Sequence, residues 1–366
     1  MESKEKKLYS TIFIVLPIIL TFFGIAAVMS ASFPVSMRIS DNGNYFFYRQ
    51  VIWVLMGWIG LIFVSRIDYK KYMNWYGWFY IAGLIMLLAV IMFGAERNGA
   101  KRWISVAGMS IQPAEFIKII FVVTAAAIIC RFKEHSLREL ITSTSVYFLM
   151  LFYVAIIMVF QKDFGTSIQL FIIAMTMLFM SGIKFIKILF FTVISGAGAV
   201  IAIITSPHRI SRIKAFVDKT GATDAGYQLK QSVLALGSGG FFGEGYGNGK
   251  QKYYYLPEPH TDFIFASIGE ELGFIGLFLI IIAFIIIFVA GINFVMKKKN
   301  EFGKLVAFGI VIMITVQALI NMYVATGLFP TKGMPLPFIS FGGSAIIGIM
   351  VSCGVLLNII KEDETE

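Results

Sequence analysis

The sequence is poor in the residues from which disulfide frameworks and metal sites are built. Its 366 residues include two cysteines and three histidines. Cys130 and Cys353 both lie at or within apolar segments, and the histidines are far apart in the chain. The cysteine spacing therefore excludes a disulfide framework and a zinc-binding pattern, and the histidines form no metal cluster.

Charged residues are also scarce. They make up 14% of the chain, whereas a soluble domain has about 25%. Motifs for nucleotide binding are missing too, because the chain has neither a Walker pattern nor G-x-G-x-x-G. The sequence thus excludes an ordinary soluble domain and gives no support to a nucleotide site, and no organic cofactor is expected.

Long hydrophobic runs are what the sequence has instead. Hydrophobic residues form 58% of the chain, and a helix that crosses about 30 Å of hydrocarbon needs roughly 20 apolar residues. The pattern predicts an all-α polytopic membrane protein, a single membrane domain over residues 1–366. Ten spans are expected, over residues 8–32, 47–65, 72–94, 113–131, 142–160, 164–182, 184–205, 262–296, 304–327 and 339–360. The run 262–296 is too long for a perpendicular span, so it is either strongly tilted or projects into the cytoplasm.

Positive charge is distributed unevenly between the predicted loops. With the N-terminus inside, the inner segments hold sixteen basic residues and the short outer loops seven, so both termini are expected in the cytoplasm. The sixteen are Lys4, Lys6, Lys7, Arg66, Lys70, Lys71, Arg131, Lys133, Arg138, Lys184, Lys187, Lys297, Lys298, Lys299, Lys304 and Lys361, and the seven are Arg38, Arg49, Arg97, Lys101, Arg102, Lys162 and Lys332. The net charge of +10 is interpreted as this bias and as attraction to anionic lipid head groups, not as nucleic-acid binding.

The stretch 206–261 is the only sizeable polar region, and the topology makes it an extracytoplasmic loop between the seventh and eighth spans. Residues 209–218 predict an interfacial amphipathic helix. Residues 227–236 predict a second, more apolar helix, which is too short to span and is expected to be re-entrant. Seven glycines follow within residues 237–249. They fit a flexible loop and equally a backbone whose N–H groups approach an anion closely.

Several ionisable residues lie in the outer half of the predicted membrane, where such residues are functional candidates by default. Glu115 and Lys118 are three residues apart on the fourth span and share a face, so they fit either a binding site or an internal ion pair. Asp163 fits either ligand binding or a cap for the sixth span. Glu270 and Glu271 lie deeper in the eighth span and are expected to form structural pairs.

Asp262 is the residue on which the functional interpretation centres. It directly precedes the eighth span, where Thr261 or Asp262 fits an N-terminal cap and Asp262 equally fits a general base. Cations lie on the same side of the predicted membrane, so we expect an outward-opening cavity for an anionic ligand such as a pyrophosphate, with apolar walls for a lipid tail. The expected lining is Asp262, Lys101, Arg102, Glu115, Lys118 and Lys332.

A series of short motifs along the chain resembles one family. The motifs are Gly99-Ala-Lys-Arg-Trp-Ile, Gln112-Pro-Ala-Glu-Phe, Asp163-Phe-Gly-Thr, Gly226-Tyr-Gln, Ala235-Leu-Gly-Ser-Gly-Gly-Phe-Phe-Gly, Tyr255-Leu-Pro-Glu-Pro-His-Thr-Asp-Phe-Ile-Phe, Gly269-Glu-Glu-Leu-Gly-Phe-Ile-Gly and Pro337-Phe-Ile-Ser-Phe-Gly-Gly-Ser. Together they resemble the SEDS family (shape, elongation, division and sporulation) over essentially the whole chain. Within it, the chain is more similar to the division and sporulation members than to the elongation member.

The resemblance implies a ten-helix fold and a peptidoglycan glycosyltransferase of the bacterial plasma membrane, expected at the division septum. Such an enzyme polymerises lipid II by an inverting β-1,4 transfer and releases undecaprenyl pyrophosphate. Implied partners are a class B penicillin-binding protein, which is a transpeptidase, and other divisome proteins. The family's essential aspartate matches Asp262, and a divalent cation, magnesium or manganese, is a candidate cofactor. The substrate-binding candidates are Lys101, Arg102, Glu115, Lys118, Glu258, His260, Thr261, Lys332, Ser340 and Ser344.

Two other functions stay open at this point. Ten spans, charged cavity residues and a lipid substrate also fit a lipid II flippase or scramblase. The clustering of polar residues on one side and the lack of a detectable internal repeat argue against a transporter. A non-catalytic scaffold that only docks and activates the transpeptidase is the third interpretation.

Overall fold

The computed structural model describes residues 3–97, 100–106, 109–131, 138–205, 210, 214, 216–217 and 223–362. Within these residues, eight helices are long and apolar enough to cross a membrane, and two shorter apolar helices accompany them. The helices are α1 (Ser3–Ser40), α2 (Tyr45–Val64), α3 (Lys70–Phe93), α4 (Pro113–Arg131), α5 (Arg138–Val159), α6 (Phe164–Met180), α7 (Phe185–Ile204), α9 (Asp224–Ser238), α10 (Gln251–Tyr254), α11 (Ile264–Lys297), α12 (Glu301–Ala325) and α13 (Gly343–Glu362). The strands are β1 (Ala95–Arg97), β2 (Ala100–Val106) and β3 (Met109–Ile111).

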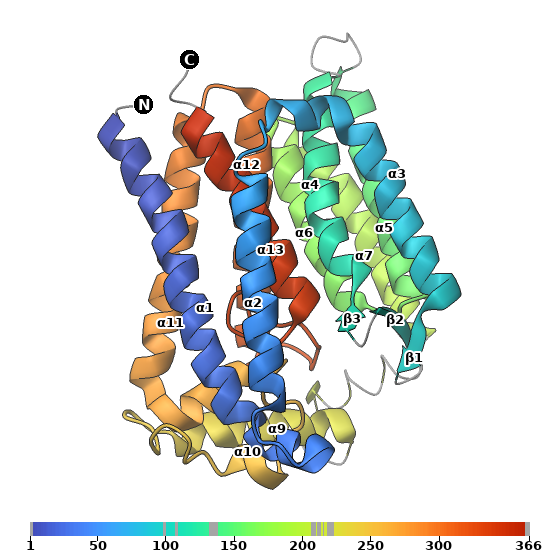
Figure 1. The fold of residues 1–366 in the computed structure, drawn as a ribbon. Helices are drawn as coiled ribbons and strands as arrows, with labels where there is room; N and C mark the ends of the chain where they lie inside the picture. The colour runs from blue at the N-terminus through green and yellow to red at the C-terminus, as the bar shows by residue number, and fades with distance from the viewer. Residues whose placement is uncertain are drawn as a thin grey trace.

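The helical bundle confirms the predicted fold class. Each of the ten predicted spans corresponds to one apolar helix among the described residues. The two ends of the chain lie at the same end of the bundle, as an even number of crossings requires (Figure 1). Helices α4, α12 and α13 are the most deeply buried of the long helices and α7 is the most exposed. The core therefore sits where the fourth, ninth and tenth predicted spans meet.

A small antiparallel sheet between α3 and α4 is a feature that the sequence analysis missed. Strand β2 pairs with β1, with Ala100 opposite Arg97, and with β3, with Ile104 opposite Ile111. The sequence predicts only an outer loop here, because strands of three to seven residues are too short to show a clear alternation. The sheet holds β2, the strand that carries Lys101 and Arg102, near the end of α3 (Figure 1).

The predicted extracytoplasmic loop is only partly described. Of the amphipathic helix predicted over 209–218, the structure describes residues 210, 214, 216 and 217 alone, so that prediction lies outside the described residues. The second predicted helix is observed as α9, which is longer than expected. It lies with α10 at the end of the bundle opposite the chain termini (Figure 1). Its re-entrant character stays a prediction.

Helix α11 is broken near its start. Gly273 has φ 64° and ψ −162°, so the predicted span 262–296 consists of two helical segments joined at a kink. Only glycine adopts this backbone conformation readily. The short first segment begins at Ile264, two residues after Asp262, and carries Glu270 and Glu271. Whatever fixes this segment therefore also fixes the position of Asp262.

The glycine-rich segment packs against the first part of α11. The N–H of Glu244 donates to the carbonyl of Glu270 at 2.9 Å, and the N–H of Gly245 donates to the carbonyl of Glu271 at 3.0 Å. A side chain at Gly243 would collide with the backbone of Glu271. Gly243 thus permits close packing of one backbone on another, and the flexible loop stays a prediction.

The two glutamates of α11 are held by this surrounding backbone. The carboxylate of Glu270 accepts from the N–H groups of Lys250 at 2.7 Å and Gln251 at 3.1 Å. The carboxylate of Glu271 accepts from the N–H of Gly247 at 3.0 Å. One of the two predictions for the glycines was a backbone whose N–H groups approach an anion. The glycine-rich backbone does so, and the anion is the internal carboxylate of Glu271.

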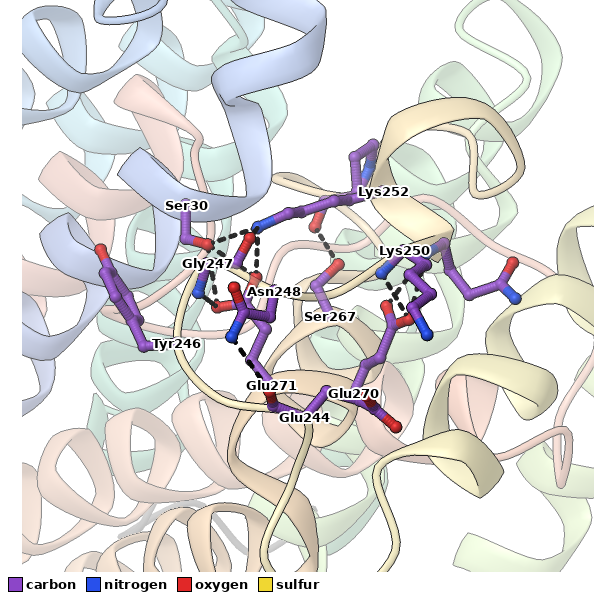
Figure 2. A network of polar contacts seen from close by, with 12 residues as sticks. Ser30, Glu244, Tyr246, Gly247, Asn248, Lys250, Lys252, Ser267, Glu270 and Glu271 are labelled. Carbon is purple, nitrogen blue, oxygen red and sulfur yellow. Dashed lines mark hydrogen bonds and ion pairs between the residues drawn. The ribbon is translucent and has the colours of Figure 1, made fainter.

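Glu271 also ties α11 to α1 and α10. Its carboxylate forms an ion pair with Lys252 at 2.6 Å and accepts from the hydroxyl of Ser30 at 2.6 Å. The ammonium of Lys252 donates in turn to Ser30 Oγ and to the carbonyl of Gly247, each at 2.8 Å. Figure 2 shows these groups converging on one carboxylate. The predicted pairing is confirmed for Glu271, whereas Glu270 is held by backbone N–H groups.

The packing of the glycine-rich segment makes a testable prediction about stability. Gly243 has φ +81°, a conformation that costs a residue with a side chain about 1–2 kcal/mol, and its Cβ would also meet the Glu271 backbone. We expect Gly243→Ala to lower the thermal unfolding midpoint of the detergent-purified protein by several degrees, measured by intrinsic fluorescence.

Gly237→Ala is the matched control. Gly237 lies in α9, and no heavy atom would lie within 4 Å of an added Cβ. Alanine is a better helix former than glycine, so this variant should unfold at the wild-type midpoint or slightly above it. Equal midpoints for the two variants would contradict the packing role of Gly243.

Candidate functional site

Asp262 lies in the turn that leads into α11, and its side chain is partly exposed. The N-cap position of α11 is occupied by Phe263, so the prediction that Thr261 or Asp262 caps this helix is wrong. The carboxylate lies against Gly333, since a Cβ atom built there would be 2.7 Å from Asp262 Oδ2. Gly333 is itself exposed, which places the carboxylate at an accessible edge.

The turn before α11 is fastened to the segment that follows α12. The hydroxyl of Ser340 donates to the carbonyl of Thr261 at 2.6 Å and accepts from the N–H of Leu336 at 2.7 Å. The N–H of Phe341 donates to the carbonyl of His260 at 2.9 Å. Ser340 is buried, so its hydroxyl joins two backbone segments.

His260 is buried between two aromatic rings. Its ring centroid lies 4.4 Å from that of Phe46 and 5.6 Å from that of Phe341, and only 3% of the residue is exposed. Burial lowers the pKa of His260 to about 4, so the imidazole is neutral at physiological pH. In the same turn, the hydroxyl of Thr261 donates to Glu258 Oε2 at 3.2 Å, and the Glu258 side chain is exposed.

Two amides of α12 hold the segments on either side of the Asp262 carboxylate. The side-chain amide of Asn321 donates to the carbonyl of Asp262 at 2.9 Å and to that of Met334 at 2.7 Å. One turn earlier, Gln317 donates to the carbonyl of Pro335 at 3.0 Å. Neither amide is among the site residues predicted from the sequence. The sequence feature that could have identified them is a pair of amides four residues apart in an apolar helix. Polar side chains in such a helix serve as interhelical hydrogen-bonding groups.

Glu115 and Lys118 form a buried ion pair. Lys118 Nζ lies 2.6 Å from Glu115 Oε2 and donates to Gln317 Oε1 at 2.7 Å. Both residues are almost completely buried. Of the two predictions for this pair, the internal ion pair is the one observed. Through Gln317 the pair nevertheless supports the segment that packs on Asp262.

Asp163 directly precedes α6, and the side chain of Lys332 reaches the same end of this helix. The ammonium of Lys332 lies 4.7 Å from the centroid of the Phe164 ring, and a Cβ atom built on Gly165 would be 3.0 Å from Lys332 Nζ. Asp163 caps α6 by accepting from the N–H groups of Gly165 at 3.0 Å and Thr166 at 3.2 Å. The predicted cap is therefore confirmed, and the cap lies beside the Lys332 side chain.

The two cations of β2 bind backbone carbonyl groups. Arg102 Nε donates to the carbonyl of Gln161 at 2.7 Å, and its Nη2 donates to that of Lys162 at 2.8 Å. Lys101 is exposed, and its ammonium lies 3.4 Å from the carbonyl of Ile91. Arg102 thus holds the turn between α5 and α6, and Lys101 lies near the end of α3.

The predicted cavity lining is therefore divided. Asp262, the segment after Lys332 and the supports from α12 lie together. Lys101 and Arg102 instead contact the carbonyl groups of α3 and of the α5–α6 turn. Ser344 accepts from the N–H of Gln112 at 2.8 Å and joins α13 to the start of α4. An apolar cavity of about 90 Å³ lies elsewhere, between α1 and α11. In the described ranges, no group of three His, Cys, Asp or Glu side chains is placed to hold a metal.

Comparison with known proteins places this arrangement in a family. The model of the cell cycle protein family FtsW/RodA/SpoVE matches residues 10–365. The probable peptidoglycan glycosyltransferase FtsW of Trichlorobacter lovleyi is 39% identical over 354 residues, which cover 96% of this chain and 93% of that protein. The stage V sporulation protein E of Bacillus subtilis is 34% identical over 355 residues, 95% of this chain and 96% of the relative.

Solved structures share the fold. Thermus thermophilus RodA, a rod shape determining protein, matches with a TM-score of 0.70 at 20% identity over 96% of both chains. A structure described as "Structural coordination of polymerization and crosslinking by a peptidoglycan synthase complex" matches with a TM-score of 0.73 at 20% identity, over 94% of this chain and 98% of that one. With the family match over residues 10–365, the relatives at 34% and 39% identity show that this chain belongs to the FtsW/RodA/SpoVE family, the SEDS proteins.

Proposed function

We propose that this protein is a peptidoglycan glycosyltransferase that polymerises lipid II into glycan strands, with Asp262 as the general base. The observation that carries the proposal is the placement of Asp262: a partly exposed carboxylate lies against an exposed glycine, in a turn held by hydrogen bonds from the buried residues Asn321 and Ser340. The names of the relatives, peptidoglycan glycosyltransferases FtsW, support the reaction class.

The proposed reaction is a single displacement. The 4-hydroxyl oxygen of a GlcNAc acceptor attacks the anomeric carbon of the MurNAc donor, and Asp262 takes the hydroxyl proton. The bond from the anomeric carbon to the pyrophosphate oxygen breaks, and undecaprenyl pyrophosphate leaves with the electron pair. The donor is α-linked and the product is β-1,4-linked, so the configuration inverts without a covalent enzyme intermediate.

The leaving pyrophosphate requires positive charge. We propose Lys332, on the segment beside Asp262, for this role, although its ammonium is buried in this conformation and would have to become accessible. Arg102 and Lys101 are additional candidates that would need to approach from β2. Magnesium and manganese are also candidates, since magnesium is usually held by one or two carboxylates together with substrate phosphates. Such a cation would be held by the oxygens of the donor pyrophosphate, so that the Asp262 carboxylate stays available to accept the proton. A bound cation would neutralise charge on the leaving group.

The remaining substrate-binding candidates fall into two groups, those with exposed side chains and those with buried side chains. Glu258 and Thr261 lie in the turn with Asp262 and are exposed or partly exposed, so we keep them as sugar-binding candidates. Glu115, Lys118, His260, Ser340 and Ser344 are buried. We assign these five residues to the support of the site, because their side chains are not accessible to a ligand in this conformation.

The cellular setting follows from the same proposal. The excess of basic residues in the inner segments supports cytoplasmic termini, which places Asp262 on the outer face of the plasma membrane, where lipid-linked sugars are polymerised. We propose a class B penicillin-binding protein as the partner, together with other divisome proteins at the septum. The synthase complex among the solved structures of the same fold supports such a partner.

Loss of the carboxylate tests the proposed base. General-base catalysis contributes about 10²–10⁴-fold, so we expect Asp262→Asn to lower the rate of polymerisation of purified lipid II by at least about two orders of magnitude. Polymerisation is measured on gels of the glycan products, with the purified protein alone and with its transpeptidase partner. Glu258→Gln, in the same turn, is the matched control and should retain activity well above that of Asp262→Asn.

The same assay separates the other functions. If Asp262→Asn polymerised lipid II at close to the wild-type rate, Asp262 would not be the general base. If wild-type protein in proteoliposomes translocated labelled lipid II, and Asp262→Asn did so equally, the flippase would be favoured. A scaffold predicts that substitutions at the site are harmless to the transpeptidase, and that substitutions on the partner-facing surface are not.

His260 gives a pH prediction that is independent of the reaction. Its pKa is lowered from 6.5 to about 4, so between these values the unfolded chain binds more protons at this residue than the folded chain. Stability therefore falls as the pH falls through this window, by up to about 3 kcal/mol from this residue. We expect His260→Phe, which keeps a ring between Phe46 and Phe341, to flatten the dependence of the thermal midpoint on pH between 7 and 4. An unchanged slope would show that His260 does not titrate in this way.

A further inference from the structure

Asn321 occupies a position from which one side chain reaches two segments of the candidate site. It lies in α12, and 1% of its surface is exposed. Its side-chain amide donates to the carbonyl of Asp262 at 2.9 Å and to the carbonyl of Met334 at 2.7 Å. These two carbonyls belong to segments more than seventy residues apart in the chain. A single amide nitrogen therefore links them.

The two segments meet at the Asp262 carboxylate. Gly333 directly precedes Met334, and a Cβ atom on Gly333 would lie 2.7 Å from Asp262 Oδ2. The hydrogen bond to Met334 thus fixes the backbone against which the carboxylate rests, and the bond to Asp262 fixes the backbone that carries it. Neither bond occupies the carboxylate oxygens.

Gln317 reinforces this arrangement from the preceding turn of α12. Residues four apart lie on the same face of a helix, and Gln317 donates to the carbonyl of Pro335 at 3.0 Å. Its amide oxygen accepts from Lys118 at 2.7 Å, which directs the amide nitrogen toward Pro335. The buried Glu115–Lys118 pair is therefore coupled to the same segment.

We propose that Asn321 is a positioning residue for the transfer reaction: its amide holds the Asp262 backbone and the 333–335 segment together, so that the carboxylate keeps the geometry needed to accept the proton. This inference rests on the proposed function, because it acts through Asp262. A misplacement of about 1 Å can cost a hundredfold in rate even when binding is retained. The loss should therefore appear in kcat, while KM for lipid II changes little.

Few side chains can replace Asn321 in both of its hydrogen bonds. An amide nitrogen supplies two hydrogens to two carbonyls, whereas a serine hydroxyl supplies one and leucine supplies none. Buried carbonyls that lose their donor are destabilised. Asn321→Leu preserves the size of the side chain and removes both bonds, and Asn321→Ser keeps one donor on a smaller side chain. Thr315→Val is the matched control, since Thr315 Oγ1 bonds only within α12, to the carbonyl of Val311.

The test is a double-mutant cycle with Asp262→Asn in the lipid II polymerisation assay. We expect Asn321→Leu to lower kcat by about 10–100-fold, and Asn321→Ser to lower it less. Added to Asp262→Asn, Asn321→Leu should lower the residual rate by less than about threefold, because residues that act as a unit are non-additive. Thr315→Val should leave kcat unchanged. An equal loss in both backgrounds, or none in the wild-type background, would overturn the proposal.

A second measurement does not depend on activity. Hydrogen exchange followed by mass spectrometry should show faster exchange in peptides covering 258–263 and 333–341 for Asn321→Leu, and not for Thr315→Val. Unchanged exchange in these peptides would overturn the proposed link between the segments. If Asp262→Asn polymerised lipid II normally, the proposed base would be wrong, whereas the exchange data would still decide whether Asn321 holds the two segments. If Asn321→Leu does not fold, Asn321→Ser carries both measurements.

Discussion

A polar group buried among membrane-spanning helices has to find its partner within the protein, and this constraint organises the structure. Hydrocarbon supplies no hydrogen bonds, and an unsatisfied group costs several kcal/mol. Glu115 is paired with Lys118, and Glu271 is paired with Lys252. Through Gln317 the first pair is linked to α12, and through Ser30 the second is linked to α1. The ionisable residues that seemed to promise a binding cavity are therefore the ones that fix the bundle, and the accessible carboxylate of Asp262 lies at its margin.

The adjacent glutamates of α11 show how neighbouring charges can be satisfied by different means. Consecutive residues in a helix are about 100° apart around the axis, so Glu270 and Glu271 point to different surroundings. Glu270 binds backbone N–H groups at the start of α10, whereas Glu271 binds a lysine, a hydroxyl and a glycine N–H. The glycine-rich segment can wrap this part of α11 because it carries few side chains. The first segment of α11, and with it the turn before the helix, is held on two sides.

Features that depend on residues close together in the chain could be predicted from the sequence, and features that depend on distant residues could not. The spans were predictable because length and apolarity are local properties. The Glu115–Lys118 pair and the Asp163 cap were also local, at spacings of three residues, and each was one of two stated alternatives. Asn321 could not be identified in this way. Its role depends on two carbonyls in remote loops, and a sequence does not reveal which carbonyls a helix will face.

The predicted topology puts several charged residues on the same side of the membrane as Asp262. Their positions around the bundle were harder to predict than the positions of the helices. Topology assigns a residue to one side of the membrane but not to a position around the bundle. Arg102 lies on the expected side, yet its guanidinium holds the carbonyls of Gln161 and Lys162. The reason is the small sheet, which fixes the direction of β2 and was not apparent from the pattern of residues. The convergence predicted for six residues therefore rested on information that the topology does not contain.

The choice of neutral amides as supports has a chemical consequence. A fixed cation beside a carboxylate stabilises the ionised form, and a carboxylate stabilised in this way is a weaker base. Asn321 and Gln317 hold the two backbone segments without adding net charge beside the carboxylate, and the Lys118 charge that steadies Gln317 is balanced by Glu115. Neutral groups in the buried helix thus set the position of the backbone around Asp262. Negative charge develops on the leaving pyrophosphate, and that is where cations would act.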